Sequence, residues 1–120
     1  KLSEDDRCSL LFCVLHIADI SNPAKPHPLN VKWGKRVLSE FFLQGDMEKS
    51  LNLPVSNLCD RETTSLSDSQ SGFIEYIVQP IFEVMESFIP AIKSEILPFI
   101  DESKKYWEAE KLKEENKKNV

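Results

Sequence analysis

The sequence is poor in the residues and patterns that build metal centres, disulfide frameworks and membrane spans. It contains two histidines and three cysteines, and Cys8, Cys13 and Cys59 lack the spacing of a zinc site. No apolar stretch approaches the ~20 residues that cross a bilayer, and the first residues do not form a signal-peptide pattern. We therefore expect reduced, buried thiols in an intracellular, cytoplasmic protein with no membrane segment in this chain. Any attachment to a membrane would lie in other segments.

Positive charge is also in the minority. The chain has 15 Lys and Arg residues against 20 Asp and Glu residues, which gives a net charge of −5. Contacts with phosphates need an excess of Lys and Arg, so the composition predicts no nucleic-acid partner. The length is enough for one domain and hardly for two. Because the chain opens without methionine and soon becomes apolar, we expect one partial domain over residues 1–120, with a charged terminal helix or tail at 101–120.

Strand-like alternation is absent, and the hydrophobic spacing predicts an all-α fold. Ser3, which three acidic residues follow, is a typical cap for a first helix. Cys8–Ile20 is apolar almost all round and predicts a buried helix. Three prolines make residues 21–28 a stiff loop.

Breaker residues divide the remainder of the chain. A second helix follows that loop, and Gly45 is expected to bend or end it. Residues 52–64 form a long loop, and loops of that length are often functional. Ser65 or Ser67 caps the next helix, which Pro80 should kink.

Asp19 is a carboxylate at the end of an apolar segment, beside Ser21 and Asn22. It can accept hydrogen bonds from loop N–H groups, or it can bind a divalent cation. A metal site needs three or more ligands, and His16 is the only histidine that shares a helix side with Asp19. The spacing leaves both interpretations open.

Two further groups lie at helical spacing. Gln70 and Phe73 share one helix face, where the amide could pair with a purine edge and the ring could stack on the base. They could equally be a polar helix residue and a core aromatic. Trp33, Val37 and Phe41 form an i, i+4, i+8 stripe, which usually belongs to a core.

The segments "HIADISNPAKP", "EFFLQGD", "LCDRE" and "SQSGFIEYIVQPIF" occur in this order. With them the chain closely resembles the C-terminal part of class I 3′,5′-cyclic nucleotide phosphodiesterase catalytic domains, from about Leu11 to Ile81. The resemblance implies an all-helical HD-superfamily fold and an active site that holds zinc and magnesium (or manganese). It also implies two-metal hydrolysis of cAMP, cGMP or both to 5′-monophosphates. The implied partners are the cyclic nucleotide and the remainder of the catalytic domain, upstream.

The resemblance assigns roles position by position. Asp19 matches an aspartate that binds zinc, and Gln70 matches the glutamine that binds the purine. Phe73 and Val37 match the two sides of the clamp on the base, and Glu40 matches an acid that helps to fix the glutamine amide. The other matched positions line the nucleotide pocket: Asn22, Trp33, Phe41 and Leu58.

The resemblance also says what this segment does not supply. His16 and His27 do not match the family's histidine motifs, so the other metal ligands and the acid histidine are expected upstream, no catalytic residue is expected here, and the segment alone should be inactive. Asn22 favours cAMP, whereas Asn30 replaces a tyrosine of some cAMP-selective members and leaves the preference open. The alternative is a non-catalytic, purine-nucleotide-binding relative or an inactive fragment.

Overall fold

The computed structural model describes residues 2–118, and the predicted all-α fold is confirmed because none of these residues forms a strand. In chain order the elements are α1 (Glu4–Asp19), the 3₁₀ turn η1 (Asn22–Ala24), α2 (His27–Ser50), α3 (Leu66–Phe73), the π-helical turn η2 (Ile74–Val78), α4 (Gln79–Glu86), α5 (Ala91–Glu95) and α6 (Leu97–Lys118). Within this range, no helix combines the length and the apolar character that a bilayer crossing requires.

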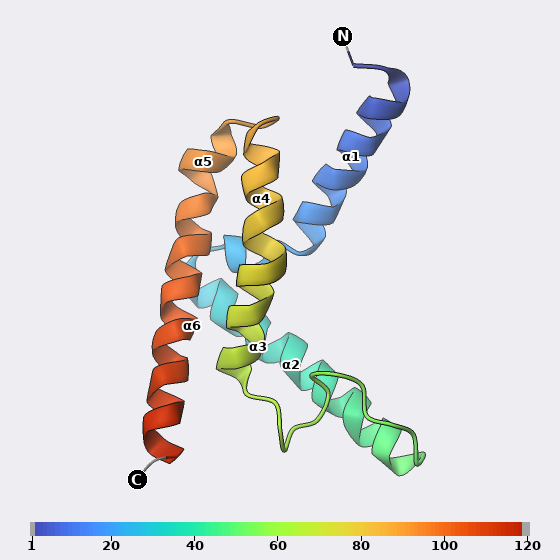
Figure 1. Cartoon of the computed structure of the whole chain (residues 1–120), viewed down its shortest axis with the longest axis vertical. Helices are drawn as coiled ribbons and strands as arrows, with labels where there is room; N and C mark the ends of the chain where they lie inside the picture. The colour runs from blue at the N-terminus through green and yellow to red at the C-terminus, as the bar shows by residue number, and fades with distance from the viewer. Residues whose placement is uncertain (1, 119–120) are drawn as a thin grey trace.

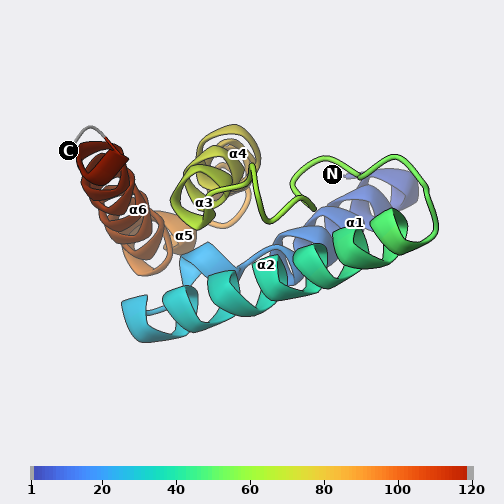
Figure 2. The same ribbon diagram turned by 90° about the horizontal axis from the view of Figure 1, so that it is seen from below.

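Two long helical segments form the body of the structure. The rod made of α3, η2 and α4 lies beside α6, and α5 joins them at one end (Figure 1). Helix α2 runs past both, and the 51–65 loop returns from its end toward α3 (Figure 2). The core lies between the rod, α5, α6 and η1, and its buried apolar residues are Ile17, Ala24, Ile74, Val78, Phe82, Met85, Ile92, Ile100 and Trp107.

Helix α1 begins as predicted but is not buried. Ser3 forms a capping box with Asp6, so the predicted N-cap is confirmed. The predicted burial is wrong, because Leu11, Phe12 and Leu15 are 68%, 71% and 69% exposed. The helix projects from the body (Figure 1), and a helix that is apolar all round needs neighbours on more than one side.

The cysteines also differ from the prediction. All three are free thiols, as expected, but Cys8 and Cys13 lie exposed on α1 and only Cys59 is buried. The two exposed thiols share the exposure of α1, whereas Cys59 packs against α2. Burial raises the pKa of the Cys59 thiol, and the negative charge of Glu48 adds to this.

Helix α2 starts earlier than predicted and runs as one helix through Gly45. It starts at His27 because Pro28 fits the first turn, where a missing N–H leaves no intrahelical bond unmade. The helix does not end at Gly45, one of the two predicted outcomes there, since it continues to Ser50. It ends in a Schellman-type cap: Asn52 adopts a left-handed conformation, with φ 54°, and the Leu53 N–H donates to the Glu48 carbonyl at 2.9 Å.

Pro80 does not break the rod. The π-helical turn η2 ends at Val78, two residues before Pro80, and the Gln79 N–H donates to the carbonyl of Ile74, five residues back. Since Pro80 cannot donate a hydrogen bond, the wider turn before it lets the helix continue as α4. The predicted irregularity is therefore a π-helical turn.

Helix α6 ties the start of α3 to the body. The carboxylate of Glu114 accepts hydrogen bonds from the hydroxyls of Ser65 and Ser67, at 2.7 and 2.9 Å. Ser65 also accepts from the Asp68 N–H, so it is the N-cap of α3. The charged segment 101–120 belongs to α6 up to Lys118, and residues 119–120 lie outside the described residues.

Candidate functional site

A cavity of about 1040 Å³ lies between the end of α1, the middle of α2, the 51–65 loop and the start of the rod. Most of the residues that the sequence singled out line it. They are Asp19, Asn22, Val37, Phe41, Leu58, Gln70 and Phe73. The fold thus brings together side chains from α1, η1, α2, the 51–65 loop and α3, and their individual roles stay predictions.

Two of the singled-out residues lie outside the cavity. Trp33 is 44% exposed and lies under the guanidinium of Arg36, whose Cζ is 5.5 Å from the ring centroid. Glu40 is exposed, and no hydrogen bond joins it to Gln70 within the described part of the chain. The two are seven residues apart, so they share one stripe of α2, while Val37 and Phe41 form the neighbouring stripe that faces the cavity.

Asp19 is the last residue of α1 and lies at the edge of the cavity. It also lines a smaller groove with Phe12, Leu15 and His16. Among residues 2–118, no three His, Cys, Asp or Glu side chains converge in a way that could hold a metal ion. A divalent cation needs several oxygen ligands, and Asp19 alone does not supply them.

Gln70 is 3% exposed, and its amide oxygen is buried without a hydrogen-bond partner among the described residues. The oxygen lies against α2, because a Cβ built on Gly34 would be 3.0 Å from Oε1. Turning the amide exchanges the positions of its oxygen and its nitrogen. The neighbours of this amide therefore determine whether the oxygen or the nitrogen points toward α2.

Asn30 and Trp107 form a buried pair beside Gln70. The Trp107 indole N–H donates to Oδ1 of Asn30 at 2.9 Å, and both side chains are buried. The Trp107 ring also lies against Gly34, with its Cζ2 atom 3.3 Å from a Cβ built there. The carboxamide oxygen of Asn30 is thus committed to the indole.

A comparison with known proteins gives the family. The family model described as 3′5′-cyclic nucleotide phosphodiesterase matches residues 1–98. The chain belongs to the 3′,5′-cyclic nucleotide phosphodiesterase family. This confirms the resemblance on which the site residues were matched.

Individual relatives agree with this assignment. Over 104 residues the chain is 39% identical to mouse 3′,5′-cyclic-AMP phosphodiesterase 4C. The aligned region covers 87% of the chain and 15% of the mouse protein. Over 93 residues it is 50% identical to mouse dual specificity calcium/calmodulin-dependent 3′,5′-cyclic nucleotide phosphodiesterase 1C. This aligned region covers 78% of the chain and 13% of the mouse protein. The chain thus spans less than a sixth of these phosphodiesterases.

A solved structure shares the fold. The structure of LmjPDEB1 in complex with IBMX superposes with a TM-score of 0.81 at 24% sequence identity, over 89% of this chain and 32% of the other. At that identity the likeness shows the fold alone. The arrangement of helices in this phosphodiesterase segment therefore recurs in a solved structure.

The 51–65 loop contributes more of the cavity than the sequence alone indicated. Besides Leu58, which the resemblance had matched, the cavity-lining residues of this loop are Val55, Ser56, Asn57, Asp60, Thr63, Thr64 and Ser65. The length of the loop was the only sign of this role in the sequence. How the loop is held was not predictable from that length.

Two glycines of α2 support the site without lining the cavity. Gly34 gives the Gln70 amide room, and Gly45 lets the 51–65 loop approach α2 closely. Glycine in the middle of a helix is less stable than alanine by about 0.5–1 kcal/mol. Its presence at both positions was therefore the sequence feature that could have indicated close contacts.

Proposed function

We propose that this chain is the part of a 3′,5′-cyclic nucleotide phosphodiesterase that binds the purine base and supplies one metal ligand for the hydrolysis of cAMP, cGMP or both to the 5′-monophosphates. The observation that supports this most directly is the buried amide oxygen of Gln70, which has no hydrogen-bond partner among the described residues and lies beside a cavity that Asp19 also lines. An unpaired buried amide costs about 1–3 kcal/mol. A ligand edge with a complementary donor and acceptor would recover that free energy.

The base would bind in the apolar part of the cavity. Val37 and Phe73 line it from two different helices, and an aromatic ring and a branched aliphatic chain suit the two faces of a flat purine. Gln70 would pair with the edge of the base through its amide. Holding the base in this way brings the cyclic phosphate toward the Asp19 end of the cavity, which is catalysis by positioning.

Asp19 would hold one of the cations, Zn²⁺ in the family pattern, with Mg²⁺ (or Mn²⁺) as the second metal. Bound divalent cations lower the pKa of water and neutralise the charge of a phosphodiester. The other ligands and the histidine that protonates the leaving oxygen would come from the remainder of the domain, which would have the all-helical architecture of the HD superfamily. The exposed apolar side of α1, with Leu11, Phe12 and Leu15, offers that remainder a surface to pack on.

The decisive experiment replaces Asp19 in a catalytic domain that contains this chain. We expect Asp19→Ala and Asp19→Asn to reduce hydrolysis of cAMP and cGMP by at least about 10–100-fold, the scale of changes that perturb even the outer support of a metal. Bound metal, measured by elemental analysis, should fall with the activity. Asp5→Asn is the matched control, because Asp5 is an exposed acid in the first turn of the same helix.

Each outcome has a defined meaning. Wild-type activity and metal content in both Asp19 variants would make Asp19 an ordinary helix-end carboxylate. A complete domain that binds cyclic nucleotides but does not hydrolyse them would favour the alternative, a non-catalytic purine-binding relative. The isolated 120 residues should show no hydrolysis, and metal-dependent turnover by them would contradict the division of the site proposed here.

A further inference from the structure

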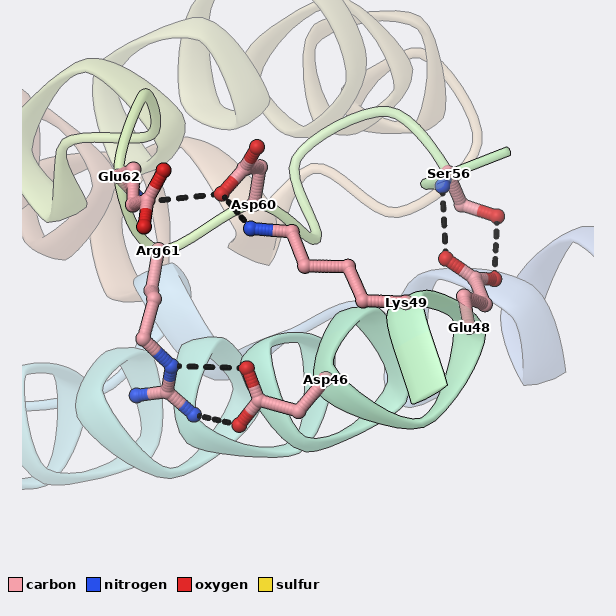
Figure 3. A network of polar contacts seen from close by, with 7 residues as sticks. All are labelled: Asp46, Glu48, Lys49, Ser56, Asp60, Arg61 and Glu62. Atoms are coloured by element: carbon pink, nitrogen blue, oxygen red, sulfur yellow. Dashed lines mark hydrogen bonds and ion pairs between the residues drawn. The ribbon is translucent and has the colours of Figure 1, made fainter. Parts of the chain in front are cut away.

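The 51–65 loop forms one wall of the cavity although it has no helix or strand of its own. It connects the end of α2 to the start of α3 and contributes residues from Val55 to Ser65 to the lining. A wall of this kind keeps its shape only if side chains fix the backbone, since a free loop would sample many conformations. The last turns of α2 provide such contacts (Figure 3).

The first contact joins Arg61 of the loop to Asp46 of α2. The Arg61 guanidinium donates to both carboxylate oxygens, with its Nε atom 3.0 Å from Oδ1, so the pair is bidentate. The guanidinium also lies over the ring of Phe42, with Cζ 5.1 Å from the centroid. Arg61 is thus held in position by two residues of the same helix.

The second and third contacts start from Glu48 and Lys49, in the same turn of α2 as Asp46. Glu48 accepts from both the backbone N–H and the hydroxyl of Ser56, each at 2.7 Å. Lys49 donates to Oδ1 of Asp60 at 2.8 Å, and the same oxygen accepts from the Glu62 N–H at 3.0 Å. These hydrogen bonds lower the pKa values of the Glu48 and Asp60 carboxyls, so both are ionised at neutral pH.

The loop backbone fits closely against α2 between these contacts. A Cβ on Gly45 would lie 2.0 Å from the carbonyl oxygen of Cys59, so only glycine permits this approach. Leu58, which directly precedes Cys59, has φ 66°, a left-handed conformation that is sterically unfavourable for a residue with a Cβ. Leu58 lines the cavity in this conformation.

We propose that the side chains of Asp46, Glu48, Lys49, Ser56, Asp60 and Arg61, here called the loop clasp, fix the cavity wall around Leu58 and thereby set the affinity of the enzyme for its nucleotide. This proposal rests on the proposed function. The clasp residues are positioning residues, and they act through the wall of the cavity. Each exposed ion pair contributes little by itself, but three contacts from about one turn of one helix restrain a loop together.

The test compares kinetics and loop order in a catalytic domain that contains this chain. Arg61→Ala and Asp46→Ala should each raise KM for cAMP and cGMP by about two- to fivefold, the range for losing an exposed ion pair, with kcat changed less than about twofold. The double variant should raise KM no more than the larger single effect, because both single changes remove the same contact. Amide hydrogen exchange of residues 52–64 should accelerate in all three variants.

A matched control comes from α6, where Lys113 forms an exposed ion pair with Glu110 at 2.6 Å, away from the cavity. Lys113→Ala should leave KM, kcat and the exchange of residues 52–64 unchanged. Unchanged KM values in the Arg61 and Asp46 variants of an active enzyme would overturn the loop clasp alone. A fall in kcat without a rise in KM would also overturn it, whereas a wild-type domain that binds no cyclic nucleotide would overturn the proposed function as well.

Discussion

Replacing Gly45 by alanine tests the contact between α2 and the 51–65 loop. An added Cβ would lie 2.0 Å from the Cys59 carbonyl oxygen, 2.8 Å from its carbon and 3.2 Å from the Cys59 Cβ. Because the nearest atoms belong to backbone, the loop must move by about 1 Å, and overpacking of this kind costs about 1–3 kcal/mol. Alanine regains about 0.5–1 kcal/mol as the better helix former. We expect a net loss of roughly 0.5–2 kcal/mol in the free energy of unfolding.

Gly72 provides the matched control, because a Cβ at that helical glycine would meet no atom within 4 Å. Gly72→Ala should therefore raise the free energy of unfolding by about 0.5–1 kcal/mol, so the same chemical change has opposite signs at the two positions. Urea unfolding followed by circular dichroism at 222 nm measures both effects. A Gly45→Ala variant as stable as the wild type would refute the proposed contact between Gly45 and Cys59.

Three further outcomes follow from individual contacts. Trp107→Phe should lower the free energy of unfolding by about 1–3 kcal/mol, measured by urea unfolding, because the buried Oδ1 of Asn30 loses its donor. Asn52→Val should cost about 1–2 kcal/mol in the same assay, since valine disfavours the left-handed conformation, whereas Asn52→Gly should cost nothing. The folded-state pKa values of Asp46 and Asp60 are lowered, so their stabilisation is complete above about pH 4–5 and is lost as pH falls through the lowered values. Hydrogen exchange of the 51–65 loop should therefore stay constant from pH 7 to pH 5, after correction for intrinsic rates, and protection should fall below pH 4.

Local chemistry made two helix starts predictable. Ser3 was predicted as the N-cap of α1, and Ser65 or Ser67 as that of α3, because a hydroxyl can satisfy N–H groups that the helix leaves free; the structure shows Ser3 and Ser65 in these roles. The spacing of the hydrophobic residues predicted the all-α class, because this spacing, like a helix cap, depends only on residues that are close together in the sequence. Contacts between distant segments were not predictable in this way. Gly45 looked like a helix breaker, and the Cys59 carbonyl that explains it lies fourteen residues further on.

The burial of α1 could not be predicted from its composition. Cys8–Ile20 contains the residues of a core helix, but among the described residues only Ile17 of this segment is buried. An apolar sequence gives a tendency to be covered and does not say which segment covers it. The predicted helix is therefore confirmed, and its predicted burial is wrong in this structure.

The candidate site was predictable where motifs fixed single positions. Matching residue by residue selected Asp19, Gln70 and Phe73, and in the structure all three line one cavity, while their roles stay predictions. Trp33 and Glu40, which the same matching selected, do not line the cavity, since the rotation of α2 decides which stripe faces it.

Kinetics of Gln70→Ala on cAMP and cGMP, in a catalytic domain that contains this chain, test the central proposal most directly. Without the amide, both KM values should rise or the preference between the nucleotides should change, by about 1–3 kcal/mol, with a smaller effect on kcat because the base is held similarly in ground and transition states. Phe73→Ala should weaken both nucleotides alike, and Gln79→Ala, which changes a glutamine outside the cavity, should have no effect. If Gln70→Ala left both KM values and the cAMP/cGMP ratio at their wild-type levels, Gln70 would be an ordinary helix residue and the purine site would not exist.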